Sequence, residues 1–402
     1  MKATNDITLR PAARLAQVSE YYFSRKIKEI ARLNEAGEDI ISLAIGSPDM
    51  PPSPQTIDTL CREVRQPSAH GYQPTAGILP LKQAMASWYR RWFQVELNPS
   101  SEIQPLIGSK EGILHVTLAF CNPGDKVLVP NPGYPTYTSL SRILGCEVVC
   151  YDLLEDHGWQ PDFATLESMD MTGVKIMWVN YPNMPTGAPA SKEVYQRIVN
   201  LARNKGILVV NDNPYSFILS HQHLSILQIP GSKDCCLEFN SMSKSHNMPG
   251  WRVGLVAGRA DYISWILKVK SNIDSGMFRP LQLAAAEAYS NDEAWHEEAN
   301  IQVYARRRQI AGRIMEALGC RYDPSQVGMF LWGRIPDCYA QVEDLTEWVL
   351  HKARVFITPG FIFGSNGKRF LRISLCAGEE KMDEALQRIQ QALSKDNSHY
   401  QQ

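Results

Sequence analysis

Residues 191–212 read SKEVYQRIVNLARNKGILVVND, and this stretch decides the fold class. Its first part has apolar residues at helical spacing, and it closes with Lys205 followed by Gly206, the usual signal for the end of a helix. The run ILVVN that follows is apolar at successive positions and rich in β-branched residues, which is typical of a strand buried on both faces. A helix that leads directly into such a strand predicts one unit of a largely parallel sheet covered by helices.

Similar short apolar runs lie on both sides of this stretch. They are KVLVP (126–130), VKIMWVN (174–180), CCLEFN (235–240) and WRVGLVAG (251–258). Together with helical patterns between several of them, these runs predict an α/β protein with a mostly parallel central sheet flanked by helices. Ligands bind at the carboxyl ends of the strands in such sheets. Polar residues just after each run are therefore candidates for the functional site.

The C-terminal third has a different pattern. A long helical stretch over about 292–318 is followed by the apolar runs MFLWGRI, VFITPGFIF and KRFLRISLC and by a final helical run. This order predicts a smaller α+β domain, against which the N-terminal helical segment EYYFSRKIKEIARLNEAG should pack. We expect a large domain at 50–285 and a small domain built from both chain ends, 1–49 and 286–402.

The bulk composition excludes several classes of function. The 402 residues carry a net charge of -1, so no basic excess points to nucleic acid. The N-terminus has no apolar core of the signal-peptide kind, and no run of apolar residues is long enough to span a membrane. The nine cysteines show no CxxC or Cys/His spacing, which argues against a metal site. Unpatterned cysteines are typical of reduced thiols, and we expect a cytoplasmic protein.

The segment FNSMSKSHNMPGWRVG (239–254) carries the first candidate for chemistry. A lysine after a strand is usually a solvated surface residue. Here Lys244 has Ser241 and Ser243 before it and Arg252 after it, among small residues. Hydroxyls and a guanidinium around one amine describe a phosphate site beside a nucleophile. A neighbouring cation and partial burial would both lower the pKa of that amine, as a Schiff base requires.

A second candidate is VVNDNPYSF, where Asp212 falls at the end of a strand and Tyr215 follows three residues later. Alone, Asp-Asn-Pro predicts an ordinary turn. If the ligand is a pyridine, a carboxylate there would keep the ring nitrogen protonated, and the ring would then act as an electron sink.

Three Gly/Pro-rich loops are individually weak signals: GSKEG (108–112), PNPGYPTY (130–137) and YPNMPTG (181–187). The first leads into a helical pattern, so its N–H groups could hold a phosphate. Tyr134 in the second could stack on an aromatic ring.

In combination, these segments resemble the class I/II aminotransferases, which are pyridoxal-phosphate enzymes of fold type I. The series G-S-K, P-G-Y-P-x-Y, P-T-G, D-x-x-Y and S-x-S-K followed by G-x-R-x-G covers nearly the whole chain. The resemblance implies a ping-pong transamination between an L-amino acid and a 2-oxo acid, with 2-oxoglutarate as the expected acceptor. It also implies a homodimer with shared active sites.

The resemblance assigns a role to each matching residue. It makes Lys244 the lysine that binds the cofactor and moves the substrate proton, Asp212 the partner of the pyridinium, and Tyr215 the hydroxyl facing the phenolic oxygen O3′. Tyr134 matches the stacking ring. The phosphate cradle consists of Ser109, Lys110, Ser241, Ser243 and Arg252. Arg372 matches the arginine that binds the substrate carboxylate through two N–H groups, and Gly46 matches the glycine whose backbone lies beside the same carboxylate. Tyr72 matches a tyrosine that reaches the phosphate of the partner subunit.

One position departs from the family pattern. The residue before P-T-G is usually an Asn that donates to O3′, and here it is Met184, whose thioether has no donor. The loss predicts that the Schiff base formed by Lys244 keeps its proton to higher pH. The alternative is that Asn183, Asn180 or a water supplies the donor.

The sequence argues against one of two rival functions and does not separate the other. A β-eliminating C–S lyase of the same fold would carry the same motifs. A regulatory domain that senses the cofactor and is fused to a DNA-binding module is disfavoured, since the chain has no helix-turn-helix extension and retains Arg372. The preferred donor stays open. Arg279 would suit a dicarboxylic substrate or a salt bridge, and Tyr21, Tyr22 and Phe23 would line a side-chain pocket or pack in the core.

Overall fold

A computed structural model describes residues 9–17 and 22–399, with side chains up to residue 396. The prediction of an α/β protein with a mostly parallel sheet is confirmed. A seven-stranded sheet lies at the centre of the molecule, in the order β2-β8-β7-β6-β5-β3-β4. All its pairings are parallel except those of β8, which runs antiparallel to both of its neighbours. The strands are β2 (Ile103–Leu106), β3 (Lys126–Asn131), β4 (Glu147–Asp152), β5 (Val174–Val179), β6 (Leu208–Asp212), β7 (Cys236–Ser241) and β8 (Gly254–Gly258).

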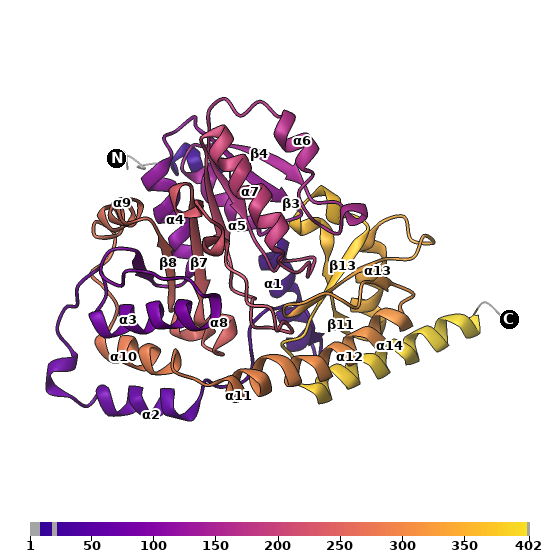
Figure 1. Ribbon diagram of the computed structural model, residues 1–402. Coiled ribbons are helices and arrows are strands. Elements are labelled where there is room, and N and C mark those ends of the chain that lie inside the picture. The colour runs from indigo at the N-terminus through magenta and orange to yellow at the C-terminus, as the bar shows by residue number, and fades with distance from the viewer. Residues whose placement is uncertain (1–8, 18–21, 400–402) are drawn as a thin grey trace, which may run out of the picture.

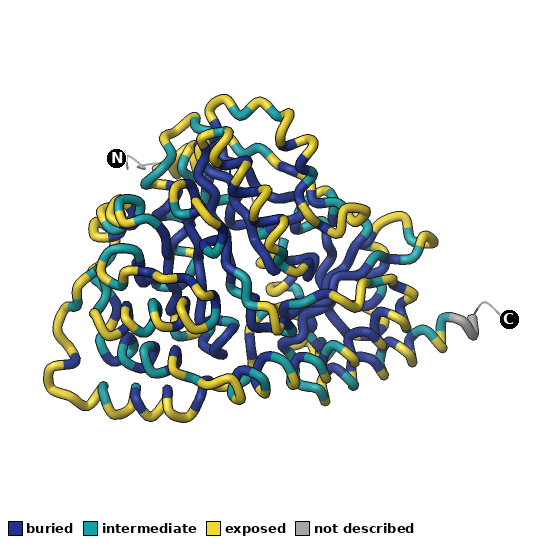
Figure 2. The backbone as a smooth tube through the Cα atoms, in the orientation of Figure 1, coloured by how far each residue is buried: buried dark blue, intermediate teal, exposed yellow. Residues whose placement is uncertain are grey.

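The helix before β6 has the ends that its sequence predicts. Helix α7 (Lys192–Lys205) begins after Ser191, whose hydroxyl accepts from the Val194 N–H, and ends at Gly206 in the left-handed region. The chain then enters β6, whose alternate side chains pack into two apolar layers. Val209 belongs to one layer and Val210 to the other. Both faces of the sheet are thus covered, as Figure 2 shows by the buried strands inside a partly exposed shell of helices.

The helices around this sheet come from the middle of the chain. They are α2 (Pro54–Glu63), α3 (Leu79–Trp88), α4 (Ser109–Phe120), α5 (Pro135–Ile143), α6 (Phe163–Ser168), α8 (Met242–Ser245), α9 (Ala260–Lys270) and α10 (Arg279–Ala288). Within the described residues, no helix combines the length and the apolar composition needed to cross a bilayer.

A second, four-stranded antiparallel sheet has the order β12-β13-β10-β9. Its strands are β9 (Arg321–Tyr322), β10 (Phe330–Arg334), β12 (Thr358–Pro359) and β13 (Phe370–Ser374). Beside it, β1 (Ile41–Ser42) pairs with β11 (Val355–Phe356). The helices in this part are α11 (Glu293–His296), α12 (Val303–Ala317), α13 (Val342–Trp348) and α14 (Glu379–His399), with a π-helical turn at Glu297–Gln302 that joins α11 to α12. Helices α12 and α14 run side by side in Figure 1.

The N-terminal helix packs on this C-terminal part, as its sequence led us to expect. Helix α1 (Tyr22–Glu35) buries Ile30 against Leu350 and Phe356. The Lys26 ammonium also pairs with Glu347 at 2.6 Å. Helix α1 therefore lies among elements of the C-terminal part, near β11 in Figure 1. The domain boundaries at 50 and 285 stay a prediction.

Candidate active site

Eleven of the twelve site residues predicted from the sequence line one cavity of about 480 Å³. The cavity lies at the carboxyl ends of β6 and β7, where a doubly wound sheet binds ligands. The eleven residues are Gly46, Ser109, Lys110, Tyr134, Asp212, Tyr215, Ser241, Ser243, Lys244, Arg252 and Arg372. They come from segments more than 300 residues apart, and the fold brings them to one place.

Lys244 occupies the short helix α8 directly after β7. The Ser241 hydroxyl accepts from the Ser243 N–H at 3.2 Å and so begins this helix. The Lys244 ammonium donates to the carbonyl of Gly46 on the opposite wall. Burial lowers the pKa of Lys244 below its ordinary value, and the positive charges of Arg372 and Arg252 act in the same direction. A lysine in such surroundings can act as a nucleophile near neutral pH.

Asp212 is the last residue of β6, and its carboxylate faces the cavity. One oxygen, Oδ2, accepts a 2.8 Å hydrogen bond from the Tyr137 hydroxyl, while Oδ1 is buried without a partner among the described residues. Burial raises the pKa of Asp212 to about 6, although the hydrogen bond from Tyr137 and the charge of Lys244 oppose this change. A buried carboxylate oxygen with no donor indicates that a cationic or N–H group of a ligand belongs there.

The N-terminus of α4 lines one part of the cavity. Ser109 is the first residue of α4, and its hydroxyl is buried without a partner among the described residues. The Arg252 guanidinium lies across the same end, where its Nη1 contacts the Ser243 hydroxyl at 3.5 Å. A Cβ atom on Gly108 would lie 2.0 Å from Arg252 Nη2, and Gly108 also has a φ of +79°. A residue with a Cβ at this position would displace the Arg252 guanidinium, so glycine keeps this cation beside the N-terminus of α4, an arrangement that could hold a phosphate.

Another part of the cavity is built around Arg372 on β13. Its guanidinium lies between the rings of Phe330 and Phe363, with its centre 3.9 and 4.5 Å from the two ring centroids. Its Nη2 donates to the carbonyl of Ala44 at 2.8 Å. These contacts fix the plane of the guanidinium, so that it can bind a carboxylate through two N–H groups.

Met184 lines the cavity and is 5% exposed. Its sulfur accepts from Arg372 Nη1 at 3.3 Å. Of the two alternative donors, Asn183 does not line the cavity, and its amide nitrogen donates to the carbonyl of Asn180 at 3.1 Å. Asn180 does line it, and one of its two N–H groups donates to the carbonyl of Asp212 at 2.6 Å. Of these two residues, Asn180 is therefore the one whose second N–H could donate in place of the expected asparagine.

Five other residues were singled out in the sequence, and the structure describes four of them. Tyr72 is 94% exposed and does not line the cavity of its own subunit. Arg279 is also outside the cavity, and its guanidinium donates to the Ser68 hydroxyl at 3.4 Å. Phe23 lines the cavity, whereas Tyr22 packs edge-on against Phe361. Tyr21 lies outside the described residues.

Sequence reasoning missed Tyr137 as a site residue. The ring is stacked on Trp178 at 5.0 Å, and burial together with the charge of Asp212 raises the pKa of Tyr137 well above its ordinary value. It therefore remains a donor to Asp212 at neutral pH. The second tyrosine of PNPGYPTY was the available signal. Phe330, Phe363 and Ile45 were also missed, because apolar residues in apolar runs give no sign that they face a cavity.

Comparisons with known proteins identify a family and several relatives. Residues 38–389 match the family "Aminotransferase class I and II". An LL-diaminopimelate aminotransferase of Moorella thermoacetica is 40% identical over 389 residues, which cover 96% of this chain and 99% of that protein. The substrate-bound structure of BacF from Bacillus subtilis has a TM-score of 0.90 at 32% identity and covers 96% of this chain and 98% of its own. An aspartate aminotransferase of Thermus thermophilus has a TM-score of 0.89 at 26% identity and covers 96% and 100%.

Proposed function

The chain belongs to the class I and II aminotransferases, and from this premise we propose that it binds pyridoxal 5′-phosphate through Lys244 and transfers the amino group of an L-amino acid to a 2-oxo acid, with 2-oxoglutarate as the acceptor. The observation that carries the proposal is the position of Lys244. Its amine has a lowered pKa and shares one cavity with a buried carboxylate, an anion cradle and a flanked arginine.

The residues present fit pyridoxal phosphate. The free oxygen of Asp212 would accept from the protonated ring nitrogen, which supplies the cation that this buried carboxylate needs. Ser109, Arg252 and the N-terminus of α4 would bind the phosphate. Tyr134 would stack on the ring, and Tyr215 would donate to O3′. Lys110, Ser241 and Ser243 complete the proposed cradle.

When bound, the cofactor supplies an aldehyde that condenses with amines and a protonated ring that withdraws electrons from the substrate α-carbon. Lys244 would hold the cofactor through its amine. Burial disfavours the charged form of this amine and lowers its pKa, so Lys244 would also be suited to accept the α-proton of the substrate. Asp212 would hold the ring nitrogen in its protonated form.

The part of the cavity around Arg372 would bind the substrate. Arg372 would hold the α-carboxylate, with the backbone of Gly46 beside it. Gly46 lies so close to Phe330 that an added Cβ would be 2.3 Å from the ring, which fixes the position of that backbone. The side chain would extend toward Phe23 and Ile45, which also line the cavity.

We also propose a homodimer in which Tyr72 reaches the phosphate in the partner subunit. The high exposure of this tyrosine supports the proposal, because a bare aromatic side chain at the surface is typical of an interface. Leu79, Ile273 and Phe278 are exposed apolar residues on the neighbouring segments and would be covered at the same time. A sedimentation experiment at micromolar concentration should give the mass of two chains, and a stable monomer would contradict this.

A panel of amino donors tests the proposed reaction. Purified protein loaded with pyridoxal phosphate is mixed with one donor and no acceptor, and the absorbance of the cofactor is followed. The panel includes LL-diaminopimelate, aspartate, and aliphatic and aromatic amino acids. At least one donor should convert the cofactor to its amino form, and 2-oxoglutarate should then restore the starting spectrum. No conversion with any donor would contradict the proposal.

A separate incubation with cystathionine tests the lyase alternative, which the comparisons do not favour, since the relatives are named as aminotransferases. A C–S lyase would release pyruvate and ammonia from cystathionine without any acceptor. We expect no such release.

A further inference from the structure

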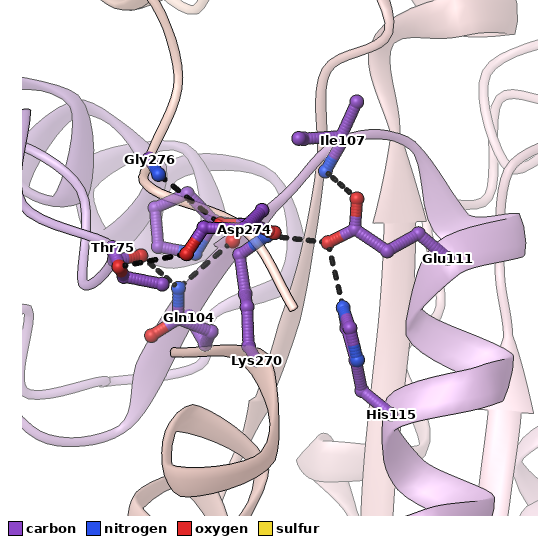
Figure 3. A network of polar contacts seen from close by, with 9 residues as sticks. Thr75, Gln104, Ile107, Glu111, His115, Lys270, Asp274 and Gly276 are labelled. Atoms are coloured by element: carbon purple, nitrogen blue, oxygen red, sulfur yellow. Dashed lines mark hydrogen bonds and ion pairs between the residues drawn. The ribbon is translucent and has the colours of Figure 1, made fainter. Parts of the chain in front are cut away.

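A buried polar network lies next to the cavity but is not part of it. Lys270, the last residue of α9, has a side chain that is 1% exposed, and its ammonium donates to the carboxylates of both Glu111 and Asp274. The imidazole of His115 contacts the same oxygen of Glu111 at 3.0 Å. Figure 3 shows Lys270 between the helix that carries Glu111 and His115 and the segment that carries Asp274. The proposed mechanism uses none of these four residues.

One arm of the network ends at the phosphate cradle of the same subunit. Glu111 lies in the first turn of α4, two residues after Ser109. Its second oxygen, Oε2, accepts from the backbone N–H of Ile107 at 3.1 Å. Glu111 therefore holds the backbone on both sides of Gly108, where the cradle requires a close approach to Arg252. Burial raises the pKa of the half-buried Glu111 carboxylate, but the hydrogen bonds from His115 and Lys270 outweigh this effect and lower it. Both contacts hold the carboxylate in place, and Lys270 supplies the fixed charge.

The other arm ends at the segment that carries Tyr72. The backbone carbonyl of Asp274 accepts from the Thr75 hydroxyl at 3.5 Å, and its carboxylate accepts from the N–H of Gly276 at 3.1 Å. At Gly276 an added Cβ would lie 2.6 Å from the carbonyl oxygen of Gln73. The turn at 274–276 is thus pressed against residues 73–75, immediately after Tyr72. Figure 3 shows this turn and Thr75 on the side of Lys270 opposite Glu111.

The arrangement argues against a metal ion at this position. Glu111, His115 and Asp274 offer ligand atoms that lie within 4.8 Å of one another. The Lys270 ammonium, however, already donates to both carboxylates and supplies the cation that they need. Lys270 therefore joins the segment that carries Glu111 to the segment that carries Asp274, and these two segments belong to different binding sites.

We propose that Lys270 is a positioning residue that ties the phosphate cradle of its own subunit to the segment 72–77, which completes the cradle of the partner subunit. The inference rests on the proposed cofactor and dimer. In each subunit, the Lys270 ammonium would then support cofactor binding at that subunit's own site and at the site of its partner. Loss of that ammonium removes the cation that joins two half-buried carboxylates, and both segments should then loosen together.

The test compares variants of the full-length protein stripped of cofactor and titrated with pyridoxal phosphate, with binding followed by tryptophan fluorescence. Lys270→Met should raise the Kd by about tenfold or more, the effect typical of a supporting residue behind a binding site. Lys82→Met is the matched control, because Lys82 is another buried lysine of the large sheet's helices and donates only to the carbonyl of Ser100 among the described residues. The control should leave the Kd within about twofold of wild type.

Hydrogen exchange of the same cofactor-free proteins separates the two arms. In Lys270→Met, amides of 105–111 and of 72–77 should both lose protection. In Asp274→Asn, which leaves the Lys270–Glu111 pair in place, only 72–77 should lose protection. If Lys270→Met does not fold, the double variant Lys270→Met/Glu111→Gln replaces it, because it leaves one buried charge fewer.

Each outcome decides the inference. An unchanged Kd in the Lys270 variant, or a higher Kd without loss of protection at 72–77, overturns it while leaving the proposed function intact. A wild-type protein that does not bind pyridoxal phosphate overturns the proposed function and this inference with it. A Kd that rises equally in Lys82→Met shows a general loss of stability, and it also overturns the inference.

Discussion

Replacing Met184 by Asn would place an amide donor in the cavity at a position where this chain has a thioether. The site can accept the change without moving the backbone, because the Met184 N–H is held by the side-chain oxygen of Asn180 at 2.8 Å and this bond does not depend on the residue type. The new amide would face the phenolic oxygen of the bound cofactor, which carries more negative charge once the proton on the link to Lys244 is lost.

The size of the effect follows from the energy of one hydrogen bond. A bond to a charged group contributes about 1.5–3 kcal/mol. At 1.36 kcal/mol for each tenfold change in acidity, this corresponds to roughly one to two pKa units. Since the donor favours the deprotonated form, Met184→Asn should lower the pKa of the Lys244–cofactor link by that amount. The wild type should keep the proton to higher pH.

Absorbance of the loaded protein as a function of pH measures this pKa directly. Met184→Leu is the matched control, because leucine has similar size and no donor, and its titration should coincide with that of the wild type. Equal pKa values in wild type and Met184→Asn would refute the reasoning. That result would mean that the second N–H of Asn180, or a water, already supplies the donor.

Three further predictions concern the same cavity. Lys244→Ala should abolish transamination, measured as 2-oxoglutarate-dependent turnover, while non-covalent binding of the cofactor persists in a dialysis experiment. Asp212→Asn should stabilise the cofactor-free protein in urea unfolding at pH 8 by up to roughly 3 kcal/mol, from the difference between a pKa of about 6 folded and 3.8 unfolded. Because the raised pKa of Asp212 favours the protonated form, its stabilising effect is present at low pH and lost as the pH rises through 6. The difference in unfolding free energy between the two proteins should therefore narrow toward pH 5. A difference that widens instead would contradict the sign of this prediction. Gly108→Ala should weaken cofactor binding about tenfold or more, because the added Cβ would lie 2.0 Å from the Arg252 side chain. Gly37→Ala is the control, because Gly37 has a similar φ of +89° but nothing within 4 Å of an added Cβ, and it should leave the affinity unchanged. Equal affinity in both variants would contradict the role of Gly108 in the phosphate cradle.

The central strands could be predicted from the sequence because each is an uninterrupted apolar run next to a clear helix end. The strand β6 and its helix α7 have the ends that Ser191 and Gly206 indicate. The direction of β8 could not be predicted in this way. A strand buried on both faces has the same composition whether it runs parallel or antiparallel to its neighbours.

The cavity residues could be predicted because each stands in a short motif after a strand or before a helix. The contacts among them could not, since they join residues far apart in the chain. The hydrogen bond from Tyr137 to Asp212 spans 75 positions, and the ion pair of Lys270 with Glu111 spans 159. Nothing near Lys270 in the sequence sets it apart from a solvated lysine at the end of an amphipathic helix.

Borohydride reduction tests the central claim most directly, namely that Lys244 carries the cofactor. The protein loaded with pyridoxal phosphate is reduced, digested and examined by mass spectrometry, which locates the lysine that keeps a phosphopyridoxyl group. We expect this group on Lys244 and its loss from that peptide in Lys244→Ala. A group on Lys110 or Lys270 instead, or no labelled lysine in a protein that binds the cofactor, would contradict it.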